Sequence, residues 1–230
     1  MPSSLEFIVS RARATLSVQE LVQCKWVWEE KPIDGWKADI QGFNDLETAE
    51  QNAEAAMLEC RGRYDEAQAT LHDLTVQGVK MARIRYRKDA AKLAIVNRLS
   101  ADGQSREQIL DQAREWSAAW AQLDPGWSPI LENTLTDFNE LYSACLRLQQ
   151  AYTDKEISWR AEAETLNAFA RSLDDVNIAW YGAATIVFLE GTVEGNLVRK
   201  NVPTTYTPES QTAEQKPSTS SPEAVAAAGP

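Results

Sequence analysis

Apolar positions three and four residues apart dominate this chain, and they predict helices. Two stretches, about 44–86 and 136–181, keep this spacing without a proline. In the first stretch, apolar and small residues alternate by four and three: Ala53, Met57, Cys60, Tyr64, Ala67, Leu71, Leu74, Gly78 and Met81. The second stretch has Leu141, Cys145, Leu148, Tyr152, Trp159, Ala163, Leu166, Ala170, Leu173 and Trp180 on its apolar face. Both patterns predict long helices that pack against others in a coiled-coil-like manner.

Two shorter helices are predicted before the long ones. The first begins at the capping-box sequence Ser3-Ser4-Leu5-Glu6 and runs to about Glu30, where Pro32, Asp34 and Gly35 break the pattern. Ser17-Val18-Gln19-Glu20 repeats the capping-box sequence, so an interruption of this first helix near Thr15-Leu16 is a second possibility. The other short helix begins at another capping-box candidate, Ser105-Arg106-Glu107-Gln108, and ends at Asp124-Pro125-Gly126.

The pattern changes after Tyr181. Residues 184–189 are continuously apolar and partly β-branched, and 190–195 have turn character. This segment fits either a last helical turn followed by a buried loop or a small hairpin, and we favour the first because no other strand is predicted. From Pro203 to Pro230 the chain is rich in Pro, Ser, Thr and Ala, which predicts a disordered tail.

The two long stretches resemble each other at an offset of 95 residues. Phe43-Asn44-Asp45-Leu46 recurs as Phe138-Asn139-Glu140-Leu141, and eight of 44 aligned positions between 43–86 and 138–181 are identical. Two amphipathic helices can match by chance, but Gly-Trp pairs at 35–36 and 126–127 favour a duplication. We therefore predict an all-α protein: an elongated four-helix bundle of two similar helix pairs, each with one short and one long helix. Residues 1–202 form one domain, with halves of about 1–90 and 91–202.

Composition indicates a folded protein with an acidic surface. The formal net charge is −11, which disfavours non-specific binding to nucleic acid or to an anionic membrane. The three cysteines, Cys24, Cys60 and Cys145, have no ligand spacing and suggest free thiols. The longest uncharged apolar run, 176–189, is too short to span a membrane, and no secretory signal is recognisable. We expect a cytoplasmic protein without a transmembrane segment.

No catalytic or metal-binding pattern is recognisable. His72 is the single histidine, and residue 69 is alanine, so the Glu-x-x-His motifs of a di-metal bundle are missing. The acidic doublets, such as Asp174-Asp175, point about 100° apart on a helix and are better explained as solvated positions. We expect no enzyme activity, no cofactor and no metal.

One charge feature contrasts with the acidic composition. Seven bases lie between residues 80 and 98 with only Asp89 among them: Lys80, Arg83, Arg85, Arg87, Lys88, Lys92 and Arg98. They are candidates for binding an anionic partner. The simpler explanation is that cations gather near a helix C-terminus and offset its dipole.

Tryptophan is the second unusual feature, with eight in the chain. Core packing explains most of them, whereas Trp36 and Trp127, beside turns, are candidates for an interface or a ligand cleft.

These features favour a non-enzymatic scaffold or interaction protein that binds a protein partner or a second copy of itself. Its helical faces, the bases of 80–98 or the arm 202–208 are the candidate contacts. Nucleic acid is a disfavoured partner. Two alternatives are a small-ligand carrier with a tryptophan-lined pocket in the bundle, and an anion-binding protein that uses the basic run 80–98.

Overall fold

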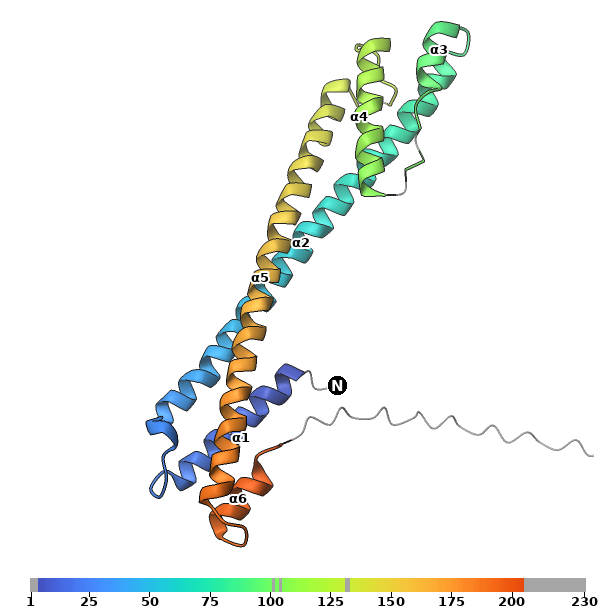
Figure 1. Ribbon diagram of the computed structural model, residues 1–230. Coiled ribbons are helices and arrows are strands. Elements are labelled where there is room, and N and C mark those ends of the chain that lie inside the picture. The colour runs from blue at the N-terminus through green and yellow to red at the C-terminus, as the bar shows by residue number, and fades with distance from the viewer. Residues whose placement is uncertain (1–3, 101, 104, 131–132, 205–230) are drawn as a thin grey trace, which may run out of the picture. The chain divides into compact units, whose positions relative to one another are not determined.

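The protein is built from α-helices (Figure 1). The computed structural model describes residues 4–100, 102–103, 105–130 and 133–204. Within these ranges the helices are α1 (Ser4–Val22), α2 (Ile33–Arg85), α3 (Ala90–Val96), α4 (Arg106–Leu123), α5 (Leu135–Val187) and α6 (Val193–Asn201), with a 3-10 turn, η1, at Trp28–Glu30. The described residues form no strand, only an isolated bridge between Ile130 and Asn133. The predicted all-α class is confirmed, but α3 and α6 raise the helix number above the predicted four.

The chain divides into two compact units. Unit 1 comprises residues 1–40 and 172–230, and unit 2 comprises residues 41–171. Helices α2 and α5 contribute to both units, because each crosses a boundary between them. Each unit also takes residues from both predicted halves, 1–90 and 91–202, and the duplication stays a prediction.

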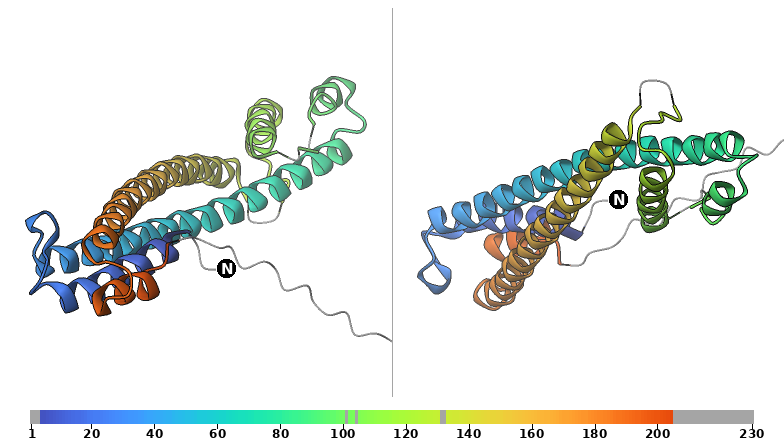
Figure 2. Two further views of the ribbon diagram at one scale, coloured as in Figure 1. Left: turned by 60° about the horizontal axis from the view of Figure 1, so that its bottom comes forward. Right: turned by 90° about the horizontal axis from the view of Figure 1, so that it is seen from above.

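Unit 1 packs α1 and α6 with the first turns of α2 and the last turns of α5. Helix α6 lies beside α1 in all views (Figures 1 and 2). The core consists of aliphatic and aromatic residues from all four helices and their connections: Val18, Val22, Trp36, Trp180, Ala184, Phe188, Val198 and Val202. Polar contacts also join α1 to α5, since Trp180 Nε1 donates to Gln19 Oε1 at 2.6 Å.

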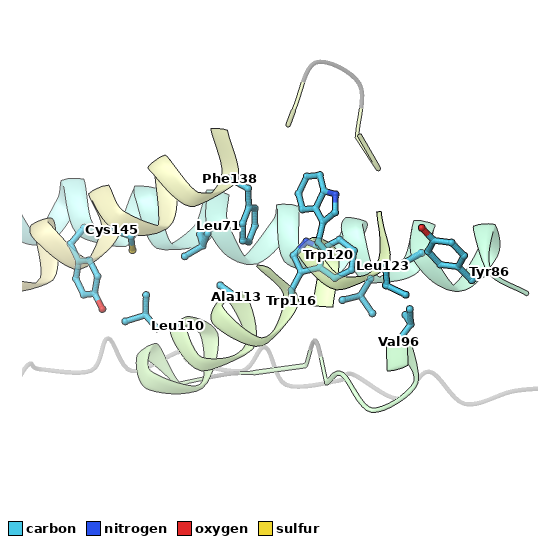
Figure 3. Close-up of a cluster of buried hydrophobic side chains, with 13 residues drawn as sticks. Leu71, Tyr86, Val96, Leu110, Ala113, Trp116, Trp120, Leu123, Phe138 and Cys145 are labelled. Carbon is cyan, nitrogen blue, oxygen red and sulfur yellow. The ribbon is translucent and has the colours of Figure 1, made fainter. Parts of the chain in front are cut away.

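The core of unit 2 is centred on α4. This helix places Leu110, Ala113, Trp116, Trp120 and Leu123 between α2 and α5 (Figure 3). The other helices complete the cluster with Tyr64, Leu71, Val79, Ala82 and Tyr86 from α2 and its end, Val96 from α3, and Phe138 and Cys145 from α5. The rings of Trp116 and Trp120 stack with centroids 5.5 Å apart. One amphipathic helix therefore provides much of the buried apolar surface of this unit.

The buried face of α2 differs from the predicted one near its end. Met81 is 43% exposed, and Val79 and Ala82 occupy the core instead. A strict alternation of four and three averages 3.5 residues, whereas a straight helix has 3.6 residues per turn, so the predicted seam drifts away from the buried face. The helix also begins at Ile33, earlier than the predicted residue 44.

The first helix is shorter than predicted. It ends at Val22 instead of running to about Glu30, and it is uninterrupted at Thr15. The amides of Lys25 and Trp26 both donate to the Val22 carbonyl, at 2.8 and 3.0 Å, which closes the helix. The turn lets Trp26 reach the core, where its ring lies 5.7 Å from that of Phe188. Tertiary burial of an aromatic residue therefore overrides the local helical pattern.

The segment after Tyr181 is helical on both sides of a turn. Helix α5 continues to Val187, and Gly191 at φ 89° provides the left-handed backbone of the turn. Thr192 then caps α6 by accepting a hydrogen bond from the Gly195 amide at 3.0 Å. The predicted loop over 190–195 is therefore wrong for 193–195, which belong to α6, while 190–192 form the turn. The predicted disorder concerns a tail whose residues 205–230 lie outside the described part of the chain.

Helix α4 starts with the predicted capping box. Ser105 Oγ accepts from the Gln108 amide, and the Gln108 side chain accepts from the Ser105 amide, both at 3.2 Å. We expect Ser105→Ala to lower the free energy of unfolding by about 1 kcal/mol, because an amide of the first turn loses its acceptor. A urea titration measures this change. Ser105→Asp should keep most of the stability, and equal losses in both variants would contradict a capping role.

No helix among the described residues has the length and apolarity needed to cross a membrane.

Candidate interaction surface

Two of the seven bases, Arg85 and Lys92, contact other parts of the fold, although the Arg85 side chain stays 45% exposed. Arg85 pairs with Asp124 at 2.9 Å, and its guanidinium lies 4.7 Å from the ring centroid of Trp127. Lys92 Nζ lies 5.1 Å from the ring centroid of Tyr86 and donates to the Leu123 carbonyl at 3.4 Å. These contacts hold the end of α2 and α3 against the end of α4. Arg85 and Lys92 thus have structural partners.

The other five bases lie at the surface. Lys80, Arg83, Arg87, Lys88 and Arg98 are all exposed, and none of them forms an ion pair with a described residue. Steps of three and four residues place Lys80, Arg83 and Arg87 on one side of α2 and its last turn, where the Tyr86 amide still donates to the Ala82 carbonyl at 2.9 Å. Arg83 Nη2 donates to the Leu99 carbonyl at 3.1 Å, which brings the segment containing Arg98 to this side. We call these five residues the basic surface.

A shallow pocket of about 260 Å³ lies within the basic surface. Lys80 and Arg83 line it together with one acid, Asp102. Its other lining residues are Val76, Val79, Leu99 and Ser100. The hydrogen bond from Ser100 lowers the pKa of Asp102, so this carboxylate stays charged and reduces the positive potential at one edge. The pocket combines apolar lining residues with two cations. This lining suits a ligand segment that has an acidic side chain next to an apolar one.

Exposed aliphatic side chains border the basic surface. Met81 is 43% and Ile84 is 59% exposed on the same stretch of α2. Cations beside exposed aliphatic residues are a combination found at protein interfaces, where a partner covers the apolar part and its acids meet the bases. The sequence predicts the basic run but not the exposure of Met81 and Ile84, because its spacing of four and three places Met81 on the buried face.

The two candidate tryptophans have different environments. Trp36 is 1% exposed in the core of unit 1, where its ring lies 5.9 Å from that of Trp28 and 6.4 Å from that of Trp180. Trp127 is half-buried, and its carbonyl accepts from Trp120 Nε1 at 2.7 Å. Both tryptophans therefore take part in packing. Among the described residues, no tryptophan lines the pocket of the basic surface or three further surface pockets, at 136–147, at 193–201 and beside Arg11.

The remaining chemical groups do not converge on a site. His72 lies half-buried on α2, and no group of three or more metal-ligating side chains occurs within the described ranges. Cys24, Cys60 and Cys145 are free thiols, and burial raises the pKa of Cys145. A buried thiol with a raised pKa is a poor nucleophile.

Comparison of the chain with known protein families, curated proteins and solved structures gives no match. The fold and its surface define an all-α protein with a localised basic surface.

Proposed function

We propose that this chain is a non-enzymatic interaction protein, and that the basic surface binds an acidic segment of a protein partner. The observation that supports this most directly is the set of five exposed bases without an ion pair among the described residues, in a chain of net charge −11. A cytoplasmic location is part of the proposal, and the three free thiols fit a reducing compartment.

The chemistry of the surface favours protein over nucleic acid as the ligand. Single-stranded nucleic acid is usually bound by exposed aromatic rings that stack on bases. Here the neighbours of the bases are the aliphatic side chains of Met81 and Ile84, which suit the apolar side of an acidic amphipathic helix.

We expect the double variant Arg87→Glu, Lys88→Glu to lose affinity for an acidic protein segment. The probe is a fluorescein-labelled amphipathic peptide of repeated Glu, Ala and Leu, and fluorescence anisotropy measures its binding. Reversal of two contact charges should weaken binding about tenfold or more, because attraction is replaced by repulsion across the interface. Higher salt should weaken binding by the unaltered protein as well.

The matched control changes the net charge equally but outside the basic surface. Arg147 on α5 and Lys200 on α6 are both exposed, so Arg147→Glu, Lys200→Glu should leave the affinity nearly unchanged. Equal losses in both double variants would indicate only a net-charge effect and would contradict a defined surface. Tighter binding of a labelled single-stranded DNA than of the peptide would favour the anion-binding alternative.

A further inference from the structure

Unit 2 also contains a negatively charged section. Residues 38–60 include no Lys or Arg, and the α2 part of unit 2 has five carboxylates in this interval: Asp45, Glu47, Glu50, Glu54 and Glu59, of which Glu59 pairs with Arg63 at 2.6 Å. Trp159 Nε1 of α5 donates to Glu50 Oε1 at 2.7 Å, and Gly42 faces the Phe169 ring. These contacts place the α5 residues between 159 and 169 beside this part of α2.

Two further carboxylates therefore join those of α2. Glu162 and Glu164 lie on this stretch of α5, together with one base, Arg160, which pairs with Glu156. We call the six carboxylates the acidic section: Asp45, Glu47, Glu50, Glu54, Glu162 and Glu164. None of the six forms an ion pair with another described residue.

The acidic section is also bordered by exposed aliphatic residues. Leu58, one turn beyond Glu54 on α2, is 49% exposed, and Ile157 on α5 is 62% exposed. Its composition thus mirrors that of the basic surface, where Met81 and Ile84 accompany the bases. Each region therefore has charges predominantly of one sign next to exposed apolar side chains, with Asp102 as the acid beside the bases and Arg160 as the base within the acidic section.

The two surfaces of unit 2 cannot neutralise each other within one molecule. Glu54 and Lys80 are both on α2, 26 residues apart, which is about 39 Å along a helix. The Debye length at physiological salt is about 8 Å, so their mutual attraction across this distance is screened. A partner that brings acids to the bases must therefore come from outside unit 2.

We propose that this partner is a second copy of the chain, whose acidic section binds the basic surface. This inference rests on the proposed function and names its partner. Because the two surfaces differ, the contact is heterologous: each copy uses its basic surface on one neighbour and its acidic section on another. Such contacts produce rings or open chains of molecules, not an isologous dimer.

Light scattering after size-exclusion chromatography tests the association directly. At about 0.1 M salt the mass of the unaltered protein should rise with concentration, and at about 1 M salt, where the Debye length is about 3 Å, it should return to that of one chain. Arg87→Glu, Lys88→Glu should be monomeric at both salt concentrations. Glu54→Lys, Glu164→Lys should also be monomeric, because it removes the other side of the same contact.

A mixture of these two double variants gives the sharpest test. The first retains an intact acidic section and the second an intact basic surface, so one productive contact remains. Equal amounts should form a 1:1 complex with twice the mass of one chain, although each variant alone is monomeric. Circular dichroism checks that both are helical.

Several results would overturn the proposal. These are an unaltered protein that stays monomeric at about 0.1 M salt, association that survives both charge reversals, and a mixture without a complex. The peptide experiment separates this failure from that of the proposed function. A monomeric protein that still binds the acidic peptide through Arg87 and Lys88 would use a different acidic partner. A protein that neither self-associates nor binds the peptide would contradict both proposals.

Discussion

Replacement of Arg11 by methionine should lower the free energy of unfolding by about 2–4 kcal/mol, one of the two largest effects that we expect in this protein. The Arg11 side chain is only 6% exposed, and Nη1 pairs with Asp174 Oδ1 at 2.6 Å. Nε donates to the Pro203 carbonyl at 2.9 Å, and Nη2 donates to that of Thr204 at 3.2 Å. Methionine fills similar space but leaves a carboxylate and two carbonyls without these donors.

A urea titration followed by circular dichroism measures the loss. We place the effect below that of a fully buried ion pair because the Asp174 side chain is 26% exposed and can recover some hydration. Lys37→Met is the control in the same unit. It removes the Lys37–Glu20 pair, whose side chains are 54% and 43% exposed, and should change stability by less than about 1 kcal/mol. Similar losses in both variants would show that burial of Arg11 has no special effect.

Arg11 also holds the segment that directly follows α6. It holds the backbone of Pro203 and Thr204, and Val202 beside them is 3% exposed. In Arg11→Met we therefore expect faster amide hydrogen exchange in α6, together with the loss of stability. Unchanged exchange there would mean that Val202 alone anchors the segment.

The second large effect concerns Gly78, near the C-terminal end of α2. A Cβ at this position would lie 2.7 Å from Cε2, Cζ2 and Nε1 of Trp116, which is fully buried. Trp116 has little room to move because its ring stacks on that of Trp120. We expect Gly78→Ala to lower the free energy of unfolding by about 1–3 kcal/mol, despite the better helix propensity of alanine. Chemical denaturation measures this change.

Gly62 is the matched control on the same helix. It is exposed, and a Cβ there would meet no atom within 4 Å, so Gly62→Ala should raise stability by about 0.5–1 kcal/mol. The same substitution thus has opposite expected signs at two positions of α2. A gain at both positions would contradict the close contact with Trp116. Shortening that side chain with Trp116→Leu should also reduce the cost of adding Gly78→Ala, since the two sites are coupled.

The sequence alone determined the all-α class and the approximate extent of the two long helices. Helical periodicity and capping boxes depend on residues within a few positions of one another, so they are visible in one chain. The Ser105–Gln108 capping box shows this well, because its spacing predicted the start of α4 and its hydrogen bonds are present. The same local signals were insufficient where Trp26 enters the core and ends α1 early.

Only the tertiary structure divided the basic run into two groups. Arg85 and Arg87 are two residues apart and both are exposed, yet Arg85 contacts Asp124 and Trp127 on a distant part of the chain, whereas Arg87 forms no ion pair with a described residue. Likewise, Trp36 and Trp127 both follow a glycine beside a turn, but Trp36 is 1% exposed and Trp127 is half-buried. Periodicity gives the direction of a side chain on its own helix, whereas its partner depends on segments brought together by folding.

The same reason explains why Arg11 and the acidic section were not predicted. The partners of Arg11 are 163 to 193 positions away in the sequence. In the acidic section, carboxylates of α2 and α5 become neighbours only because Trp159 reaches Glu50, 109 positions earlier. The sequence determined the all-α class, the approximate extent of the two long helices and the position of the basic run. The tertiary structure decided which charges are paired and which remain at the surface, because ion pairs and burial depend on distances in space that sequence separation does not specify.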